Sequence, residues 1–323
     1  MRQKLPLNLR SLYEDVTRRV MAADLLPASI VTRRSRGHAY LHAVIRDGGQ
    51  RRSVYLGRAD DLQAQAHAER YRRASRQAKD TKIAIQALRR SSFVAMSPAY
   101  GRLLEVVANA GLFKAGLVLV GTIAYQQYTW LLGAELTEGA ARTDDADFSI
   151  ARFAVQSIPK DTDPLEVILK RADPSFEPKW HHDDKLPRAF TSDHLSVEML
   201  TTKGRKHELL EIPRLHCAAV PLAYMDYLLS EPIDVVALYG AGVPIKVPDP
   251  ARYAIHKLLI ERGAYSSKSD KDLHQAAELI SILRDQEPDR LDMAVAAAKR
   301  AGPSWRRRLD ERLRQVNALL AEP

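Results

Sequence analysis

The 323-residue sequence has one cysteine and no long apolar run, and each shortage excludes a class of protein. The single cysteine, Cys217, can form neither an internal disulfide nor a cysteine-rich zinc site, and we interpret it as a small buried apolar side chain. The best apolar run, Ala115 to Ala124, is about half as long as a membrane-spanning helix. The charged N-terminus lacks the apolar core of a secretory signal. We therefore expect a soluble, cytoplasmic protein that does not enter a membrane.

Positive charge is concentrated in the first third of the chain. Residues 1–110 contain 21 Lys and Arg against 9 Asp and Glu, a net charge of +12, whereas residues 111–323 have a net charge of −3. This asymmetry is typical of a polyanion-binding region joined to another module. It favours a nucleic acid or another polyanion as partner, and a solvated basic helix without a partner is the alternative.

Residues 1–110 have the patterns of a small basic region. Apolar residues at helical spacing predict a helix within 1–28, and alternation on either side of an Asp-Gly-Gly turn predicts a β-hairpin within 30–57. Further helices are predicted over 60–90 and 99–109. The arginines that flank the hairpin suit contact with a nucleic acid backbone, although the hairpin could equally be a packing element. We assign 1–110 as a candidate acceptor-binding region.

The pattern changes to α/β after residue 110 and to helix after residue 248. Predicted strands cover 117–120, 145–150, 195–200 and 244–247, with a helix from the end of the first strand to about 132 and an irregular polar connection over 157–193. Predicted C-terminal helices cover about 250–263, 269–285, 288–300 and 303–321. The predicted fold class is α+β, with a small mixed-sheet core over 111–248, a helical region over 249–323 and the basic hairpin-plus-helix region before them.

Two carboxylates, Asp145 and Asp147, lie two positions apart on a predicted strand. Side chains two apart on a strand point to the same face, so both carboxylates should project toward one site. Their mutual repulsion would be relieved by a divalent cation, and hard oxygen ligands suit Mg²⁺ or Mn²⁺. A second metal ion about 3.5–4 Å away would complete an arrangement for in-line displacement.

A third acidic residue, Glu198, lies in the middle of another apolar strand. A lone carboxylate there is costly unless it is paired or bound to metal, and we therefore predict that Glu198 joins Asp145 and Asp147 as a catalytic metal ligand. An edge strand with Glu198 in water is the alternative.

A Gly-Thr pair ends the first strand of the core. Gly121 removes the side chain where a phosphate would approach the backbone, and Thr122 adds a hydroxyl at the start of a helix with free N–H groups. The Gly-Thr pair is a stronger indication of a phosphate-binding turn because Asp-x-Asp follows on a predicted strand 23 residues after Thr122.

This arrangement resembles the polymerase-β-type nucleotidyltransferase superfamily. The shared features are Val120-Gly121-Thr122, the helix after it, Thr143 to Phe148 and a separate acidic strand. More closely, the chain is similar to a bacterial nucleotidyltransferase-fold family, the GSU2403-like proteins, in its hairpin and in three downstream segments: Val247 to Arg252, His256 to Leu258 and Lys271 to Ala276. A more distant likeness is to the AbiEii-type toxin nucleotidyltransferases.

The resemblance implies transfer of a nucleoside monophosphate from an NTP to an acceptor hydroxyl. By the same resemblance Lys257 would contact the nucleotide phosphates and Asp272 would support the site. Arg252 is a further nucleotide-binding candidate on the same helix as Lys257, and Arg262 is a weaker one. The superfamily usually has Gly-Gly or Gly-Ser in place of Gly-Thr, and Asp in place of Glu198. Two other acidic residues, Glu208 and Glu211, are therefore alternatives for the third ligand.

For the acceptor we favour RNA, including a tRNA end, bound by the basic region. The toxin likeness suggests a toxin–antitoxin or defence role with an antitoxin protein as partner, by analogy only. Two other functions stay open. One is a binding module that keeps the fold without the chemistry, and the other is a transferase that modifies a protein or a small molecule.

Overall fold

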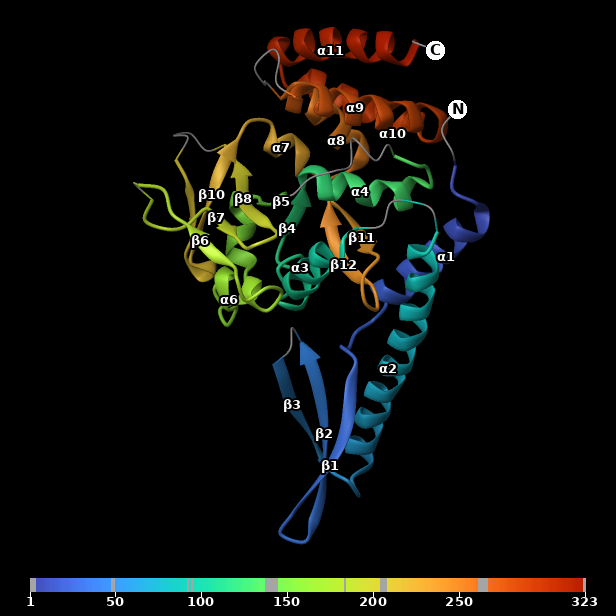
Figure 1. The fold of residues 1–323 in the computed structure, drawn as a ribbon, viewed down its shortest axis with the longest axis vertical. Helices are drawn as coiled ribbons and strands as arrows, with labels where there is room; N and C mark the ends of the chain where they lie inside the picture. The colour runs from blue at the N-terminus through green and yellow to red at the C-terminus, as the bar shows by residue number, and fades with distance from the viewer. Residues whose placement is uncertain are drawn as a thin grey trace.

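The computed structural model has the α+β fold that the sequence predicts, with an arm below a mixed-sheet core and a layer of helices above it (Figure 1). The structure describes residues 4–47, 50–91, 93, 96–136, 145–182, 184–203, 208–260 and 267–321. The predicted hairpin turn at Gly48 and Gly49 and the motif residues Thr143 and Asp144 lie outside these residues.

The N-terminal region begins with helix α1 (Leu7–Met21) and continues into an antiparallel sheet of order β1-β2-β3. Its strands are β1 (Ala28–Ser35), β2 (His38–Asp47) and β3 (Gln50–Arg58). The hairpin predicted from the Asp-Gly-Gly turn is β2–β3, and β1 adds a third strand that the sequence analysis did not predict.

A long helix, α2 (Leu62–Arg89), runs along this sheet and forms with it the arm (β1–β3 and α2). The carboxylate of Asp61 caps the helix by accepting a hydrogen bond of 2.9 Å from the backbone N–H of Gln63. Leu41 packs against Ala64 and Ala68, whose small side chains allow the helix to lie close to the sheet. The inward-facing residues of β2 are therefore buried and those between them face away from α2.

The root of the arm is held to the core by apolar packing. Tyr13 and Val16 of α1 join Leu88 at the end of α2 in a cluster that also contains Trp130 and Val236 from the core. The hydroxyl of Tyr13 donates a hydrogen bond of 3.1 Å to the carbonyl of Val236. The sheet of the arm projects away from this root, toward the opposite end of the molecule from the C-terminal helices over 267–321 (Figure 1).

The main sheet has the order β4-β5-β8-β10-β9. Strands β5, β8 and β10 run parallel, and β4 and β9 flank them in the antiparallel sense. The five strands are β4 (Leu117–Val120), β5 (Asp145–Ile150), β8 (Ser196–Thr202), β10 (Cys217–Leu222) and β9 (Leu210–Ile212). Cys217 is fully buried, as interpreted from the sequence, and burial raises the pKa of its thiol to about 12.

The connection over 157–193, predicted to be irregular, contains regular elements. They are the end of a 3₁₀ helix (Arg152–Ser157), the helix α6 (Leu165–Lys170), and the hairpin of β6 (Glu177–Lys179) and β7 (Ala189–Thr191). Strand β7 pairs with β8 and thereby widens the main sheet. A separate two-stranded sheet joins β11 (Ile233–Ala237) to β12 (Val243–Val247).

Helices cover the core. The bounds are α3 (Pro98–Asn109), α4 (Gly121–Leu132), α7 (Met225–Leu228), α8 (Pro250–Leu259), α9 (Ser267–Gln286), α10 (Pro288–Arg300) and α11 (Pro303–Ala321). Helix α8 ends four residues before its predicted end because Ile260 takes extended backbone angles. Both α4 and α8 are buried along most of their length, so the C-terminal helices are part of the core packing. Among the described helices, none combines the length and apolar composition needed to cross a bilayer.

Candidate active site

Two predicted carboxylates lie side by side on neighbouring strands. Asp147 of β5 is in register with Glu198 of β8, and the two strands run parallel. Register partners on adjacent parallel strands point to the same face, with about 4.8 Å between the strands. Glu198 is exposed, while Val197 and Met199 on either side of it are buried on the opposite face. The sheet therefore presents both carboxylates on one surface.

The first carboxylate of the predicted set begins β5. Asp145 is in register with Ser196, two positions before Asp147 and so on the same face of the strand. Its side chain lies outside the described part of the structure. Among the described side chains, which do not include that of Asp145, no group of three or more His, Cys, Asp and Glu residues could hold a metal ion. The metal site stays a prediction.

Neither alternative third ligand lies on a strand next to β5. Glu211 is on β9, at the far edge of the sheet, with β8 and β10 between it and β5. Glu208 precedes β9 and is exposed. Of the three acidic candidates, only Glu198 is on the strand next to Asp147.

The carboxylate of Asp147 lies directly beside the backbone of Gly121. Gly121 has a φ of +68°, and a Cβ added to it would lie 2.2 Å from Oδ2 of Asp147. Any other residue would have to displace that carboxylate. Because α4 begins at Gly121, the carboxylate also lies at the positive end of a helix, where backbone N–H groups lack intrahelical acceptors. Thr122 follows in the first turn and is largely buried.

Tyr253 fixes the backbone at this turn. This residue of α8 is buried, and its hydroxyl lies 3.0 Å from the carbonyl oxygen of Gly121 and 3.1 Å from Oε1 of Gln275 on α9. Burial raises the pKa of the phenol well above 10, and the charges of Asp272 and Asp147 raise it further. The phenol therefore keeps its proton and donates it to one of the two oxygens. Tyr253 was not among the site residues predicted from the sequence.

Lys257 and Asp272 form a buried ion pair. The Lys257 ammonium lies 2.5 Å from Oδ1 of Asp272, and the two side chains are only 9% and 6% exposed. The same ammonium lies 5.3 Å from the centre of the Tyr253 ring. The structure thus brings together two residues that the resemblance places at the nucleotide site. It also shows them joining α8 to α9.

Arg252 has different neighbours. Its guanidinium lies 2.8 Å from Oε2 of Glu231 and 5.0 Å from the centre of the Tyr227 ring. Arg252 is in the first turn of α8, and Lys257 is near the other end of that helix. Arg262, the weaker candidate, lies outside the described residues.

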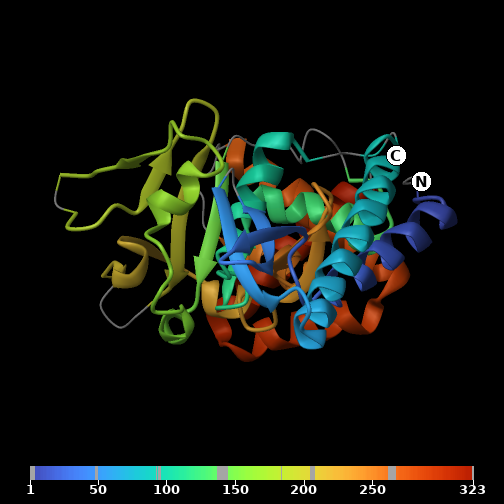
Figure 2. The same cartoon turned by 90° about the horizontal axis from the view of Figure 1, so that it is seen from below.

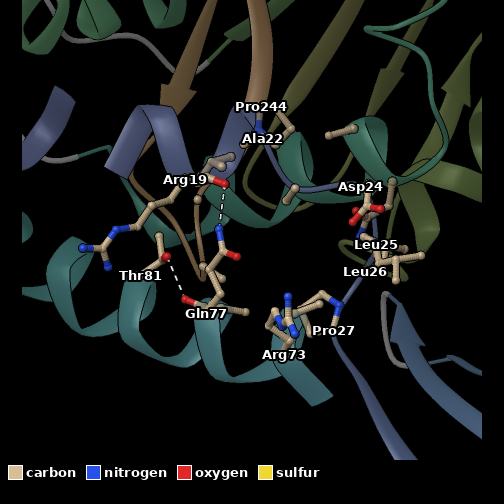
Figure 3. Close-up of a pocket in the computed structure, with 18 of the residues that line it drawn as sticks. Arg19, Ala22, Asp24, Leu25, Leu26, Pro27, Arg73, Gln77, Thr81 and Pro244 are labelled. Carbon is tan, nitrogen blue, oxygen red and sulfur yellow. Dashed lines mark hydrogen bonds between the residues drawn. The ribbon is translucent and has the colours of Figure 1, made fainter. Parts of the chain in front are cut away.

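A cavity of about 470 Å³ lies where the arm meets the core, and none of the predicted site residues lines it (Figure 3). Gln77 crosses one wall and donates a hydrogen bond of 3.0 Å to the carbonyl of Arg19. The wall also carries the cations Arg73 and Lys114. This cavity is separate from the carboxylate surface.

The family of the chain is given by one comparison. A family model described as Nucleotidyltransferase matches residues 99–299, which is more than half of the chain. The chain belongs to this nucleotidyltransferase family. Neither the curated proteins nor the solved structures give a match. The matched range runs from α3 into α10 and contains every predicted site residue, but not the arm. The narrower resemblances to the GSU2403-like and AbiEii-type proteins stay predictions.

A first prediction concerns the contact between Gly121 and Asp147. Gly121→Ala should lose binding of NTP and divalent metal, because its methyl group would occupy the place of the Asp147 carboxylate. The matched control is Gly111→Ala, since Gly111 has a φ of +76° with nothing within 4 Å of an added Cβ. Both variants should lose about 1–2 kcal/mol of stability from backbone strain. Titration calorimetry and urea unfolding measure the two effects, and equal ligand binding by both variants would show that the close approach is unimportant.

A second prediction concerns the buried ion pair. Lys257→Met should reduce the free energy of unfolding by about 3–5 kcal/mol, because the Asp272 carboxylate would stay buried without the opposite charge of Lys257. The double variant Lys257→Met/Asp272→Leu should recover most of this loss. Lys246→Met is the matched control, since its 2.8 Å pair with Asp234 is more exposed and should contribute about 1 kcal/mol or less. A loss below about 1 kcal/mol in Lys257→Met would instead favour a lysine held mainly for the nucleotide.

Proposed function

We propose that the protein transfers a nucleoside monophosphate from an NTP to a hydroxyl group of RNA. The acceptor oxygen forms a bond to the α-phosphorus, the bond from that phosphorus to the pyrophosphate oxygen breaks, and the hydroxyl proton passes to a base. Family membership supports nucleotidyl transfer in general. The observation that carries the proposal for this chain is the register of Glu198 beside Asp147, whose carboxylate rests on the turn at Gly121.

The donor set fits a hard divalent cation. Asp147 and Glu198 offer carboxylate oxygens on one face of the sheet, and Asp145 occupies the same face two positions earlier. Mg²⁺ or Mn²⁺ held by these three residues would neutralise charge on the phosphate oxygens. Glu198, the exposed member, is placed to accept the proton of the acceptor hydroxyl.

The remaining residues bind or position the nucleotide. Gly121 leaves room beside the backbone, and Thr122 and the first N–H groups of α4 offer donors to the triphosphate. The hydroxyl of Tyr253 lies 3.0 Å from the carbonyl oxygen of Gly121 and supports the backbone of this turn. We assign Lys257 and Asp272 a positioning role, because their ion pair fixes α8 against α9. Arg252 stays a candidate contact that would have to exchange Glu231 for phosphate.

The acceptor is assigned from charge. The net charge of +12 on residues 1–110 lies outside the matched family region except for its last residues. It is therefore available for an acceptor that carries many phosphates, which favours RNA over a protein or a small molecule. A toxin role with an antitoxin partner rests on the AbiEii resemblance alone.

An inactive RNA-binding module is the second candidate. It is favoured by one observation, namely that the net charge of +12 on residues 1–110 lies almost entirely outside the matched family region. The two functions differ in a single measurement, which is the incorporation of labelled nucleotide from each NTP into total cellular RNA.

A third prediction uses that assay. Asp147→Asn and Glu198→Gln should each reduce transfer by at least about 10²-fold, because each removes a charge from the reacting centre. Glu211→Gln is the matched control, an exposed carboxylate of the same sheet three strands away from β5, and should stay near wild type. The melting temperature of Asp147→Asn should be equal or higher, since neighbouring carboxylates repel each other. Wild-type transfer in Asp147→Asn would eliminate the site as proposed.

A fourth prediction concerns the basic region. If five or six of its cations contact phosphates of a single-stranded acceptor, log K should fall with log salt with a slope of roughly −4. Replacing Arg33, Arg34 and Arg52 by Gln should weaken binding across RNA sequences and flatten this slope by about 2. Neutralising Arg306, Arg307 and Arg314 on α11 provides a control with the same charge change. Salt-insensitive binding would assign the acceptor to another surface.

A further inference from the structure

The sheet of the arm has one covered face and one open face. Helix α2 packs on the covered face. Of the described helices, it is the one that runs along this sheet in Figure 1. On β2, Leu41, Ala43 and Ile45 are buried toward α2. The residues that alternate with them, such as Tyr40 and His42, therefore belong to the open face.

The open face carries a row of rings. Tyr55 of β3 is in register with His42 of β2, and their ring centroids are 5.4 Å apart. Tyr40 lies next to both, with its ring centroid 6.0 Å from that of Tyr55. The Ser53 hydroxyl lies 3.3 Å from Nδ1 of His42 and helps to orient that ring. Tyr55 is 59% exposed, although burial of an aromatic ring is favourable, so its flat surface is available to a partner.

Cations lie at both ends of this row. Arg33 and Arg58 are the register partners of Tyr40 on the two neighbouring strands, and Arg46 is paired with Arg51 at the other end. All four are exposed. Arg58 is bound to Asp60 at 2.8 Å, whereas the other three form no ion pair within the described part of the chain. The face is thus aromatic in the middle and cationic at its ends.

We propose that this open face is a stacking platform for single-stranded RNA. Bases of a single strand would stack on Tyr40, His42 and Tyr55, and their phosphates would contact Arg33, Arg46 and Arg51. An apolar protein partner would have to bury these cations without compensation. A duplex hides the flat surfaces of its bases, and only a single strand can use both the rings and the charges.

The platform rests on the proposed function, in that it binds the RNA to which the nucleotide is transferred, and its position restricts how it acts. Along the longest axis of the molecule, the arm sheet hangs below the core, whereas the β4–α4 turn that holds Gly121 lies beneath the C-terminal helices (Figure 1). The view from below places the arm sheet under the core (Figure 2). A strand on the platform is therefore a distant part of the acceptor and not its reacting end.

Equilibrium binding of the full-length protein to labelled RNA, without NTP or metal, tests this proposal. The probe is a mixed-sequence oligonucleotide, used as a single strand and annealed to its complement. The single strand should bind more tightly than the duplex. Tyr55→Leu should weaken single-strand binding by about tenfold or more, because leucine is apolar but has no planar ring, whereas Tyr55→Phe should bind like wild type.

Two controls separate stacking from charge and from a general surface effect. Arg51→Gln should flatten the salt slope by about 0.7, whereas Tyr55→Leu should lower affinity without changing that slope. Trp180→Leu removes an equally exposed ring, 58% exposed, from the β6–β7 hairpin of the core and should leave binding unchanged. Since Tyr55 is exposed, the variants should melt at the wild-type temperature.

Wild-type affinity in Tyr55→Leu, or equal losses on single strand and duplex, would overturn the platform. The result is independent of catalysis. Transfer activity combined with Tyr55-independent RNA binding would reject the platform and keep the transferase. Tyr55-dependent binding without any transfer would keep the platform and reject the transferase.

Discussion

The carboxylate of Asp147 rests on the backbone of Gly121, and the candidate site is arranged around this contact. It requires a residue without a side chain at a positive φ, directly at the point where β4 becomes α4. The carbonyl of the same glycine lies 3.0 Å from the hydroxyl of Tyr253, so α8 supports the turn from the other side. One glycine thus connects the acidic strand, the helix that follows β4 and the C-terminal helices. The matched family region contains all of these elements.

The C-terminal helices are attached through buried polar groups as well as apolar packing. Lys257 pairs with Asp272, and the Tyr125 hydroxyl donates to the carboxylate of Glu278. The hydroxyl of Tyr128 donates to the carbonyl of Pro248 at 2.9 Å. Buried ion pairs contribute little net stability, but breaking one is costly, so such contacts favour a single orientation of the helices. That orientation brings Tyr253 to Gly121.

Local patterns were sufficient to predict much of this fold. They were not sufficient to predict which strands pair across long stretches of sequence. The strands of Leu117–Val120 and Asp145–Ile150 were predictable because each has a strong apolar pattern with a clear end. Strand β10 was missed because it contains Pro221, which argues against a central strand. In β1, Arg33 and Arg34 hide the alternation.

The candidate site shows the same division. The two-residue spacing of Asp145 and Asp147 on one strand was visible in the sequence. The register of Glu198 beside Asp147 was not, because it is set across a connection that contains α6, β6 and β7. Lys257 and Asp272 were identified together, yet a buried ion pair and a phosphate contact require the same residue types. Tyr253 could have been found as a hydroxyl-bearing ring in a buried helix, four residues before Lys257, because such a hydroxyl needs a partner.

The separation of arm and core limits the kind of substrate that both can bind. The arm sheet and β5, the strand that carries Asp147, lie at different levels along the longest axis of the molecule (Figure 1), so we expect a small molecule bound at Asp147 to make no contact with the arm sheet. The same holds for a free NTP, which we expect to make no contact with the arm sheet. If the positive charge of the arm serves the reaction, the acceptor must therefore be a polymer long enough to reach from the sheet to the β4–α4 turn. Contacts on the arm would then be made equally in the ground state and the transition state, so they would lower KM for long acceptors and leave kcat unchanged. Short acceptors would gain nothing from the arm, and the length of RNA at which its benefit begins would measure the distance between the two surfaces.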